Sequence, residues 1–404
     1  MLKKIKVPDV RLGMYLQEIC ASWMDHPFWR KSFLLEDAAD LKTLQTCGVT
    51  DVWIDTKKGL DVSAGAEVSS EQDEEQKIES ELEQIASEPT REVHRVSLND
   101  EVARARKIHA KAREAVVSMF GEARLGRAVD VAGAGELVDE INQSIARNSS
   151  ALLSLARLKG KDDYTYLHSV AVCALMVALG RQLGLKGEQL RDVGMAGLLH
   201  DVGKMLIPEE VLNKPGRLTD EEFEQVKQHP VKGWELLKAS KNVCAIAQEV
   251  CLHHHEKVDG SGYPDHLSGE ALTLVSRMGA VCDVYDALTS NRCYKSGWEP
   301  GEALRKMAEW RNGHFDEAVF HAFVKTVGIY PTNTVVKLKS GRLAVVLDQS
   351  DKSLLTPVVK VFFSTRSNTR IPVEIVDLAK SAESIAGMED STQWAADIKK
   401  LTGI

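Results

Sequence analysis

Residues 197–208 read GLLHDVGKMLIP, and they place His200 and Asp201 side by side at the end of an apolar run with helical character. An imidazole can ligate one metal ion, and the two oxygens of an adjacent carboxylate can reach two ions. Alone, the pair is weak evidence, because an aspartate that caps a helix next to a core histidine is the more common reason for it. The rest of the chain has to decide between these interpretations.

Residues of the same kind recur around the pair in helical context. The first lies 32 positions upstream in YLHSVAVCALMVALG, where His168, Val172, Leu175 and Leu179 are spaced four, three and four apart, as on one buried helix face. Others follow in KQHPVKG, VCLHHHEKVDGSGYP and AVCDVYDALTSNRCYK. Together with the pair, the similar residues are His168, His200, Asp201, His229, His254, His255 and Asp283.

The helical pattern predicts an all-helical bundle over residues 97–330. Ser97 can cap its first helix, with Asp100 three positions on, and Thr219 with Glu222 has the spacing of a capping box. Pro230 breaks that helix and can begin the next. No strand-rich stretch interrupts the region.

The flanking segments have a different character. Residues 1–62 predict a small α+β domain, with strands in KIKVPDVRLGMYL and TDVWIDT and a helix that ends at Gly48. Residues 63–96 predict an acidic linker or a loose polar helix. Residues 331–404 predict a short β-rich unit, followed by a final helix within 381–403. The fold class is therefore mainly α, with small β-containing units at both ends.

Bulk composition excludes several classes of protein. The formal charge of the 404 residues is −8, and Glu67–Glu88 alone carries nine acids and one lysine, so the remainder is close to neutral and lacks a basic nucleic-acid surface. Seven scattered cysteines without a CxxC pair are typical of a reducing cytoplasm. The N-terminus has no apolar stretch like that of a signal peptide, and the longest apolar run, 169–180, is too short to span a bilayer. We therefore expect a soluble, cytoplasmic protein without membrane or nucleic-acid partners.

Four motifs, HDVGK, HPVKG, HHEKVDGSGYP and DVYDALTSNRCYK, together resemble the HD-GYP phosphodiesterases, a branch of the HD-domain metal-dependent phosphohydrolases. The resemblance covers about residues 150–330. The first 60 or so residues, with GMYL, DHPFW and VWIDTKKG, look like the small uncharacterised domain often found ahead of HD-GYP modules. That second resemblance implies no activity.

The resemblance makes the seven candidates ligands of two divalent ions, Fe, Mn or similar. Asp201 would bridge them, and a bridging hydroxide would attack phosphorus in line. Since neighbouring positions 254 and 255 do not share a helix face, we expect one of these histidines on each ion. The resemblance assigns no role to His253, and we give equal weight to its being exposed and to its being buried. Some relatives bind a third ion through a glutamate where this chain has Tyr164, so we expect two ions.

The resemblance also implies a phosphate-binding side. Lys204, Arg292 and Lys295 match family contacts to substrate phosphate, although each alone has the ordinary character of a surface charge. In the loop DGSGYP, the glycines permit close backbone approach, and the resemblance assigns Gly262, Tyr263 and Pro264 to substrate binding. This chain has Cys293 where relatives commonly have proline, which would loosen the turn that presents Lys295.

The implied function is hydrolysis of cyclic di-GMP to pGpG, with further cleavage to GMP left open. Two alternatives remain at this stage. One is hydrolysis of another cyclic dinucleotide or nucleotide, and the other is a catalytically idle sensor that binds cyclic di-GMP and signals through protein partners. The complete ligand set and Lys204 favour an enzyme.

Overall fold

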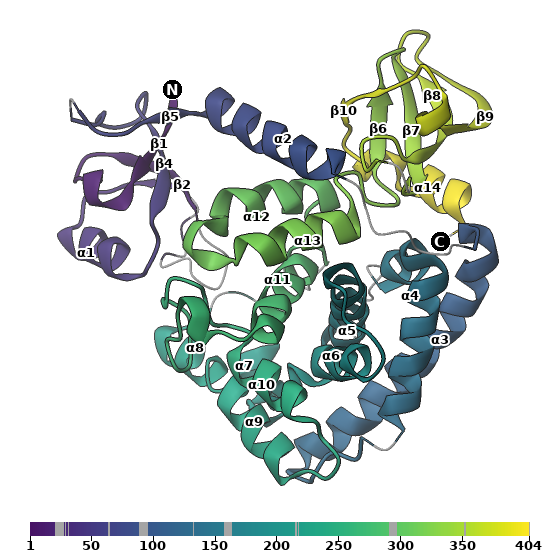
Figure 1. The fold of residues 1–404 in the computed structure, drawn as a ribbon. Coiled ribbons are helices and arrows are strands. Elements are labelled where there is room, and N and C mark those ends of the chain that lie inside the picture. The colour runs from purple at the N-terminus through teal and green to yellow at the C-terminus, as the bar shows by residue number, and fades with distance from the viewer. Residues whose placement is uncertain are drawn as a thin grey trace. The chain divides into compact units, whose positions relative to one another are not determined.

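The structure is a computed structural model, and the residues it describes are 1–20, 28, 30, 32–63, 65–88, 96–131, 133–156, 164–214, 216, 218–290, 297–350 and 353–403, without the side chains of Asn99, Tyr164 and Asn312. The chain divides into two compact units (Figure 1). The first contains Met1–Leu82 together with Arg305–Asn312, and the second contains Glu83–Leu304 together with Gly313–Ile404.

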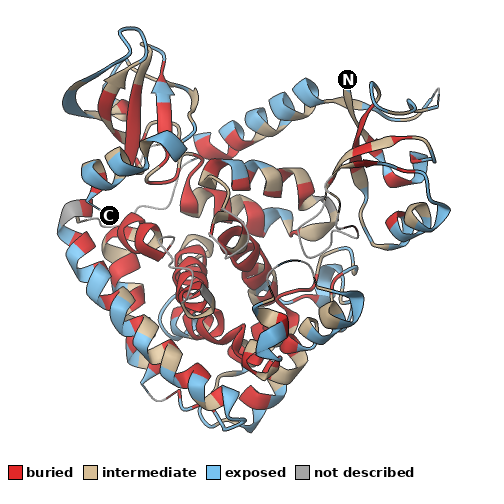
Figure 2. Cartoon of the chain, turned by 180° about the vertical axis from the view of Figure 1, so that it is seen from behind, coloured by how far each residue is buried: buried red, intermediate tan, exposed pale blue. Residues whose placement is uncertain are grey.

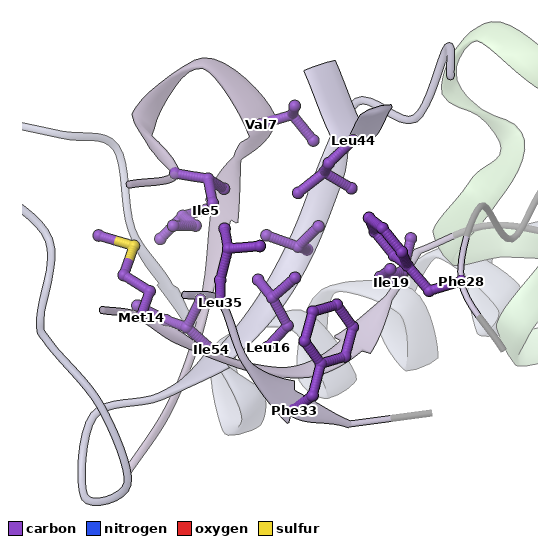
Figure 3. Close-up of a cluster of buried hydrophobic side chains, with 12 residues drawn as sticks. Ile5, Val7, Met14, Leu16, Ile19, Phe28, Phe33, Leu35, Leu44 and Ile54 are labelled. Carbon is purple, nitrogen blue, oxygen red and sulfur yellow. The ribbon is translucent and has the colours of Figure 1, made fainter. Parts of the chain in front are cut away.

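The first unit contains an antiparallel sheet of strand order β3-β2-β4-β1-β5. Its strands are β1 (Leu2–Lys6), β2 (Tyr15–Ile19), β3 (Phe33–Leu34), β4 (Asp51–Asp55) and β5 (Ser69–Ser70). Helix α1 (Ala38–Thr46) ends just before Gly48, as predicted. Buried side chains from the strands, the helix and the loops between them form one apolar core, drawn in Figure 3. The sequence prediction of a small α+β unit is confirmed.

A buried polar cluster also belongs to the first unit. Glu309, from the segment Arg305–Asn312, accepts a hydrogen bond from Trp53 Nε1 at 2.7 Å and lies 3.6 Å from Lys4 and 3.1 Å from Lys306. Burial alone would raise the pKa of this carboxyl, but the two lysines outweigh it and lower the pKa. A segment more than 200 residues from the N-terminal strands in sequence therefore completes this unit.

Much of the acidic segment 63–96 is helical. Residues Glu71–Ser87 form α2, and Leu82, Ile85 and Ala86 near its end are buried. The polar-helix alternative is therefore the one that the structure shows for these residues. The other face of the helix remains acidic and exposed.

The described residues between Leu98 and Val327 are mainly helical, as predicted, and they belong to the second unit except for Arg305–Asn312 of α12. Ser97 accepts a hydrogen bond from Asp100 N, and Thr219 with Glu222 forms the predicted capping box. The helices are α3 (Leu98–Arg124), α4 (Ala134–Ala156), α5 (Tyr164–Leu183), α6 (Glu188–Leu199), α7 (Glu209–Leu212), α8 (Asp220–Val226), α9 (His229–Ala239), α10 (Ala245–His253), α11 (Leu274–Thr289), α12 (Pro300–His314) and α13 (Glu317–Val327). Short 3₁₀ turns η2 (Val202–Leu206) and η3 (Gly269–Ala271) connect some of them.

Helix α5 is the most buried of these elements, as Figure 2 shows in red. Its segment Thr165–Leu183 is long and apolar enough to cross a membrane by length and composition, but 78% of that window is buried inside the protein. Core helices of globular domains share this property. The buried polar residues of this helix include His168, which is 1% exposed, and its neighbour Ser169.

The end of the second unit is a five-stranded antiparallel sheet of order β10-β6-β7-β8-β9. Its strands are β6 (Val335–Leu338), β7 (Arg342–Asp348), β8 (Val358–Ser364), β9 (Thr369–Asp377) and β10 (Ile385–Met388). The β-rich prediction is confirmed, but the final helix was predicted too long: only Ala395–Thr402 forms α14. Residues 385–388 pair with β6 instead, because Ile385 and Met388 cover an apolar cluster of the sheet.

Candidate metal centre

Six helical elements of the second unit bring the seven predicted ligands together. His168 comes from α5, His200 follows α6, and Asp201 precedes η2. His229 begins α9, His254 and His255 follow α10, and Asp283 lies in α11. None of the seven residues is more than 7% exposed. Seven polar residues thus lie inside the helical core, where each requires a partner.

Two glycines allow two of these segments to approach closely. A Cβ atom on Gly203 would lie 1.9 Å from the carbonyl oxygen of His229 and 2.6 Å from the nitrogen of Gly233. A Cβ atom on Gly233 would lie 2.6 Å from Cys251 Sγ. The glycines of HDVGK and HPVKG therefore pack η2 against α9, which sets the separation between Asp201 and His229.

The ligand atoms form two groups that share one carboxylate. Asp201, His229, His254 and His255 offer atoms within 4.8 Å of one another, and so do His168, His200, Asp201 and Asp283. Asp201 Oδ1 lies 3.3 Å from His229 Nε2, whereas Oδ2 lies 3.3 Å from His168 Nε2. Each oxygen of this aspartate therefore faces a different group, which is the geometry of a bridging ligand.

Three of the imidazoles are oriented by backbone carbonyls. The Nδ1 atom of His200 lies 2.8 Å from Gly197 O, and that of His229 lies 2.7 Å from Val226 O. His254 Nδ1 lies 3.0 Å from Cys251 O. Because a carbonyl oxygen only accepts, Nδ1 must carry the proton in each ring, and Nε2 is left as the free donor atom of the neutral imidazole.

These Nε2 atoms point at one another. His200 Nε2 lies 3.2 Å from His168 Nε2, and His229 Nε2 lies 3.3 Å from His254 Nε2. Burial lowers the pKa of both His229 and His254, so these two rings are neutral, and lone pairs this close cannot hydrogen-bond and need a cation between or beside them. Among the residues that the structure describes, no donor hydrogen-bonds to the buried Asp201 Oδ1 either. The donor set therefore fits divalent metals that accept nitrogen and oxygen ligands.

The pKa shifts describe the same demand for positive charge. Burial lowers the pKa of His200, but Asp201 and Asp283 outweigh it and raise the pKa to about 10. Burial lowers the pKa of His229 to about 4, against a smaller opposing effect of Asp201. The pKa of Asp201 lies well below its usual value, because Lys204 and His200 overcome the effect of burial. The group with two carboxylates thus holds the ring whose pKa is raised, and the other group holds a ring whose pKa is lowered.

We expected one metal for each of His254 and His255, but the ligand atoms of both lie in the group with His229, which favours a shared ion instead. The reason is that α10 ends at His253, so the two side chains are not held at helical angles to each other. His253 is 8% exposed, and its two ring nitrogens lie 3.1 Å from Glu249 and 3.0 Å from Asp265. It is thus a buried, paired residue.

The DGSGYP loop folds against the end of α10. The ring of Tyr263 stacks on His255 with centroids 4.8 Å apart, and its peptide bond to Pro264 is cis. A Cβ atom on Gly262 would lie 2.4 Å from Glu256 Cα, so this glycine approaches the chain's own backbone. Lys204 is partly exposed and pairs with Asp201 Oδ2. The loop and the lysine therefore both adjoin the ligand groups.

Other predicted residues lie outside the described part of the chain. They are Arg292, Lys295 and Cys293, together with the side chain of Tyr164. One residue was missed: Asp286, whose Oδ2 lies 2.6 Å from His168 Nδ1. Its signal was present in DVYD, because Asp283 and Asp286 are three positions apart and share a helix face.

Comparisons with known proteins agree with these motifs. Residues 2–134 match a domain of unknown function (DUF3391), and residues 139–319 match an HD domain. A cyclic di-GMP phosphodiesterase of Pseudomonas aeruginosa is 52% identical over 397 residues, covering 98% of this chain and 94% of that protein.

Two further relatives each match less than half of this chain. A cyclic di-GMP phosphodiesterase response regulator of Xanthomonas campestris pv. campestris is 42% identical, with 47% of this chain and 50% of that protein covered. A 3'3'-cGAMP-specific phosphodiesterase of Vibrio cholerae is 35% identical, with 44% and 41% covered. Relatives of this chain therefore carry the names of enzymes with two different cyclic dinucleotide substrates.

Proposed function

The chain belongs to the HD-GYP family of HD-domain cyclic di-GMP phosphodiesterases, and from this premise we propose that it opens cyclic di-GMP to pGpG in a metal-dependent reaction. The observation that carries the proposal is Asp201, with one oxygen toward each of two groups of buried ligand atoms. An idle sensor would not need a carboxylate that bridges two such groups.

The proposed ligands divide into His229, His254 and His255 on one side of Asp201 and His168, His200 and Asp283 on the other. Two divalent ions, Fe, Mn or similar, would activate a water molecule and neutralise charge on the phosphodiester. The backbone carbonyls that hold the Nδ1 protons keep the Nε2 atoms directed into the site. Burial excludes bulk water, which strengthens every electrostatic interaction there.

Lys204 is the proposed phosphate-binding residue nearest to the ligands. Its ammonium group already lies beside Asp201, within reach of an anion that contacts the same centre. The loop residues Gly262, Tyr263 and Pro264 are proposed to shape the substrate pocket, and the stacking of Tyr263 on His255 supports this assignment. Arg292 and Lys295 remain proposed phosphate contacts on the strength of their motif.

The proposal extends to the setting of the enzyme. We place it in the cytoplasm, with cyclic di-GMP and signalling proteins as partners, and without nucleic acid or membrane. The domain boundaries remain as proposed from the sequence: residues 1–62, 63–96, 97–330 and 331–404.

The deciding experiment follows nucleotide products by chromatography after the purified protein is incubated with cyclic di-GMP and Mn²⁺ or Fe²⁺. We expect pGpG to appear, with or without later GMP, and EDTA to abolish its formation. Faster turnover of 3'3'-cGAMP than of cyclic di-GMP would indicate the alternative substrate. Tight binding of cyclic di-GMP without turnover under either metal would refute the enzyme in favour of the sensor.

A further inference from the structure

A second carboxylate of α11 lies behind the proposed ligands. Asp286 follows Asp283 by one helical turn, is 1% exposed, and places Oδ2 2.6 Å from His168 Nδ1. The opposite ring atom, His168 Nε2, lies 2.9 Å from Asp283 Oδ1 and 3.3 Å from Asp201 Oδ2. Asp286 therefore contacts the ring on the side away from the other ligand atoms.

This contact differs in charge from the corresponding contacts of the other rings. His200, His229 and His254 each direct Nδ1 at a backbone carbonyl, which is a neutral acceptor. His168 directs Nδ1 at a full negative charge. A carboxylate both fixes the protonated atom and makes the opposite nitrogen a stronger donor to a metal.

We propose that Asp286 is a positioning residue that makes the group of His168, His200, Asp201 and Asp283 the tighter of two unequal metal sites. The inference rests on the proposed ligand set. This group holds two carboxylates, and Asp286 adds a third negative charge directly behind it, whereas the group of His229, His254 and His255 shares only Asp201. Each added carboxylate near a divalent cation favours its binding.

The surroundings of Asp286 allow its charge and its hydrogen bond to be tested separately. Ser290 Oγ lies 3.4 Å from Oδ2, and the side chain borders a small cavity lined also by Ser150, Ser154 and Gln349. Asn has the same shape as Asp, and its Oδ1 can still accept from His168 Nδ1, so Asp286→Asn removes mainly the charge. Asp286→Ala removes the orientation as well.

The test measures Mn²⁺ binding to the full-length, metal-stripped protein, with free Mn²⁺ counted by electron paramagnetic resonance. We expect two ions of different affinity in the wild type. In Asp286→Asn the affinity of the tighter site for Mn²⁺ should fall about 10–100-fold. In Asp286→Ala it should fall by at least as much, and in both variants the affinity of the weaker site should change less. For turnover of cyclic di-GMP with Mn²⁺, kcat should fall and KM should change little.

A matched control is Asp265→Asn, which makes the same chemical change beside His253, a buried histidine outside the ligand set. It should leave both Mn²⁺ affinities within about threefold of the wild type. Unchanged affinities in Asp286→Asn, or equal weakening of both ions, would overturn the inference while leaving the proposed function intact. A wild-type protein that binds no Mn²⁺ or Fe²⁺ would overturn both. If Asp286→Ala does not fold, Asp286→Asn alone decides.

Discussion

Gly203→Ala is the most severe small change that the structure offers near the site. The added Cβ atom would lie 1.9 Å from His229 O, 2.6 Å from Gly233 N and 2.8 Å from Gly233 Cα. All three neighbours are backbone atoms, so no side chain can move aside. Because Cβ atoms essentially never come closer than 3.0 Å to such neighbours, η2 and α9 would have to separate by more than an ångström.

The expected loss of stability and of metal affinity in Gly203→Ala follows from the residues that η2 and α9 contain. Overpacking a well-packed core costs about 1–3 kcal/mol of folding stability. Metal affinity should suffer more, since productive ligand distances tolerate only about 0.2 Å. Asp201 lies two residues before Gly203, and the new Cβ atom would clash with the carbonyl oxygen of His229. Both proposed ligands would therefore be displaced. We expect Mn²⁺ affinity to fall at least tenfold and cyclic di-GMP turnover to fall with it.

Unfolding in urea, with Mn²⁺ binding measured on the same samples, tests this expectation. The matched control is Gly121→Ala in the last turn of α3, where a Cβ atom would meet nothing within 4 Å. That variant should gain about 0.5–1 kcal/mol, because alanine in a helix loses less conformational entropy than glycine. If Gly203→Ala binds two ions with wild-type affinity, the close approach of η2 and α9 does not set the ligand geometry, and the reasoning fails.

Three more predictions follow from the ligand groups. Asp201→Asn should lose both metal and turnover, whereas Lys204→Ala should keep its metals and lose about 10²-fold in kcat; loss of metal in Lys204→Ala would contradict this division of roles. The pKa of His200 is raised from 6.5 to about 10, so its protonated ring stabilises the metal-free fold. This contribution is complete below pH 6.5 and is lost as the pH rises toward 10. Urea unfolding of EDTA-treated protein between pH 6.5 and 9.5 should show that loss, and His200→Gln should reduce it. Anomalous scattering from crystals grown in excess Mn²⁺ should show two ions per chain, and one or three well-occupied sites would contradict the assignment.

Local sequence signals predicted most of the fold. The caps at Ser97 and Thr219 and the glycine after α1 depend on hydrogen bonds and dihedral angles within a few residues. The prediction failed at residues 385–388, where helix-compatible residues become a strand because β6 offers an open edge and an apolar cluster beside it. Tertiary packing overrides weak local preference there.

The site shows a similar division. The seven ligand candidates could be named from the sequence because its motifs resemble those of the HD-GYP phosphodiesterases. It could not show that Gly203 faces Gly233 or that His253 lies between Glu249 and Asp265, because these contacts join separate elements. The motifs identify the ligand candidates. The orientation of each ligand side chain depends on hydrogen-bond partners that are not part of the motifs.

The ends of the helices account for that orientation. The last carbonyls of a helix have no backbone partner within it. His200 and His254 cap α6 and α10, and His229 follows the end of α8, so each ring finds an unused carbonyl three residues back for its Nδ1 proton. His168 lies inside α5, where the carbonyl one turn back is already bonded to a backbone N–H. A ring in that position must take its acceptor from another element, and Asp286 on α11 supplies it.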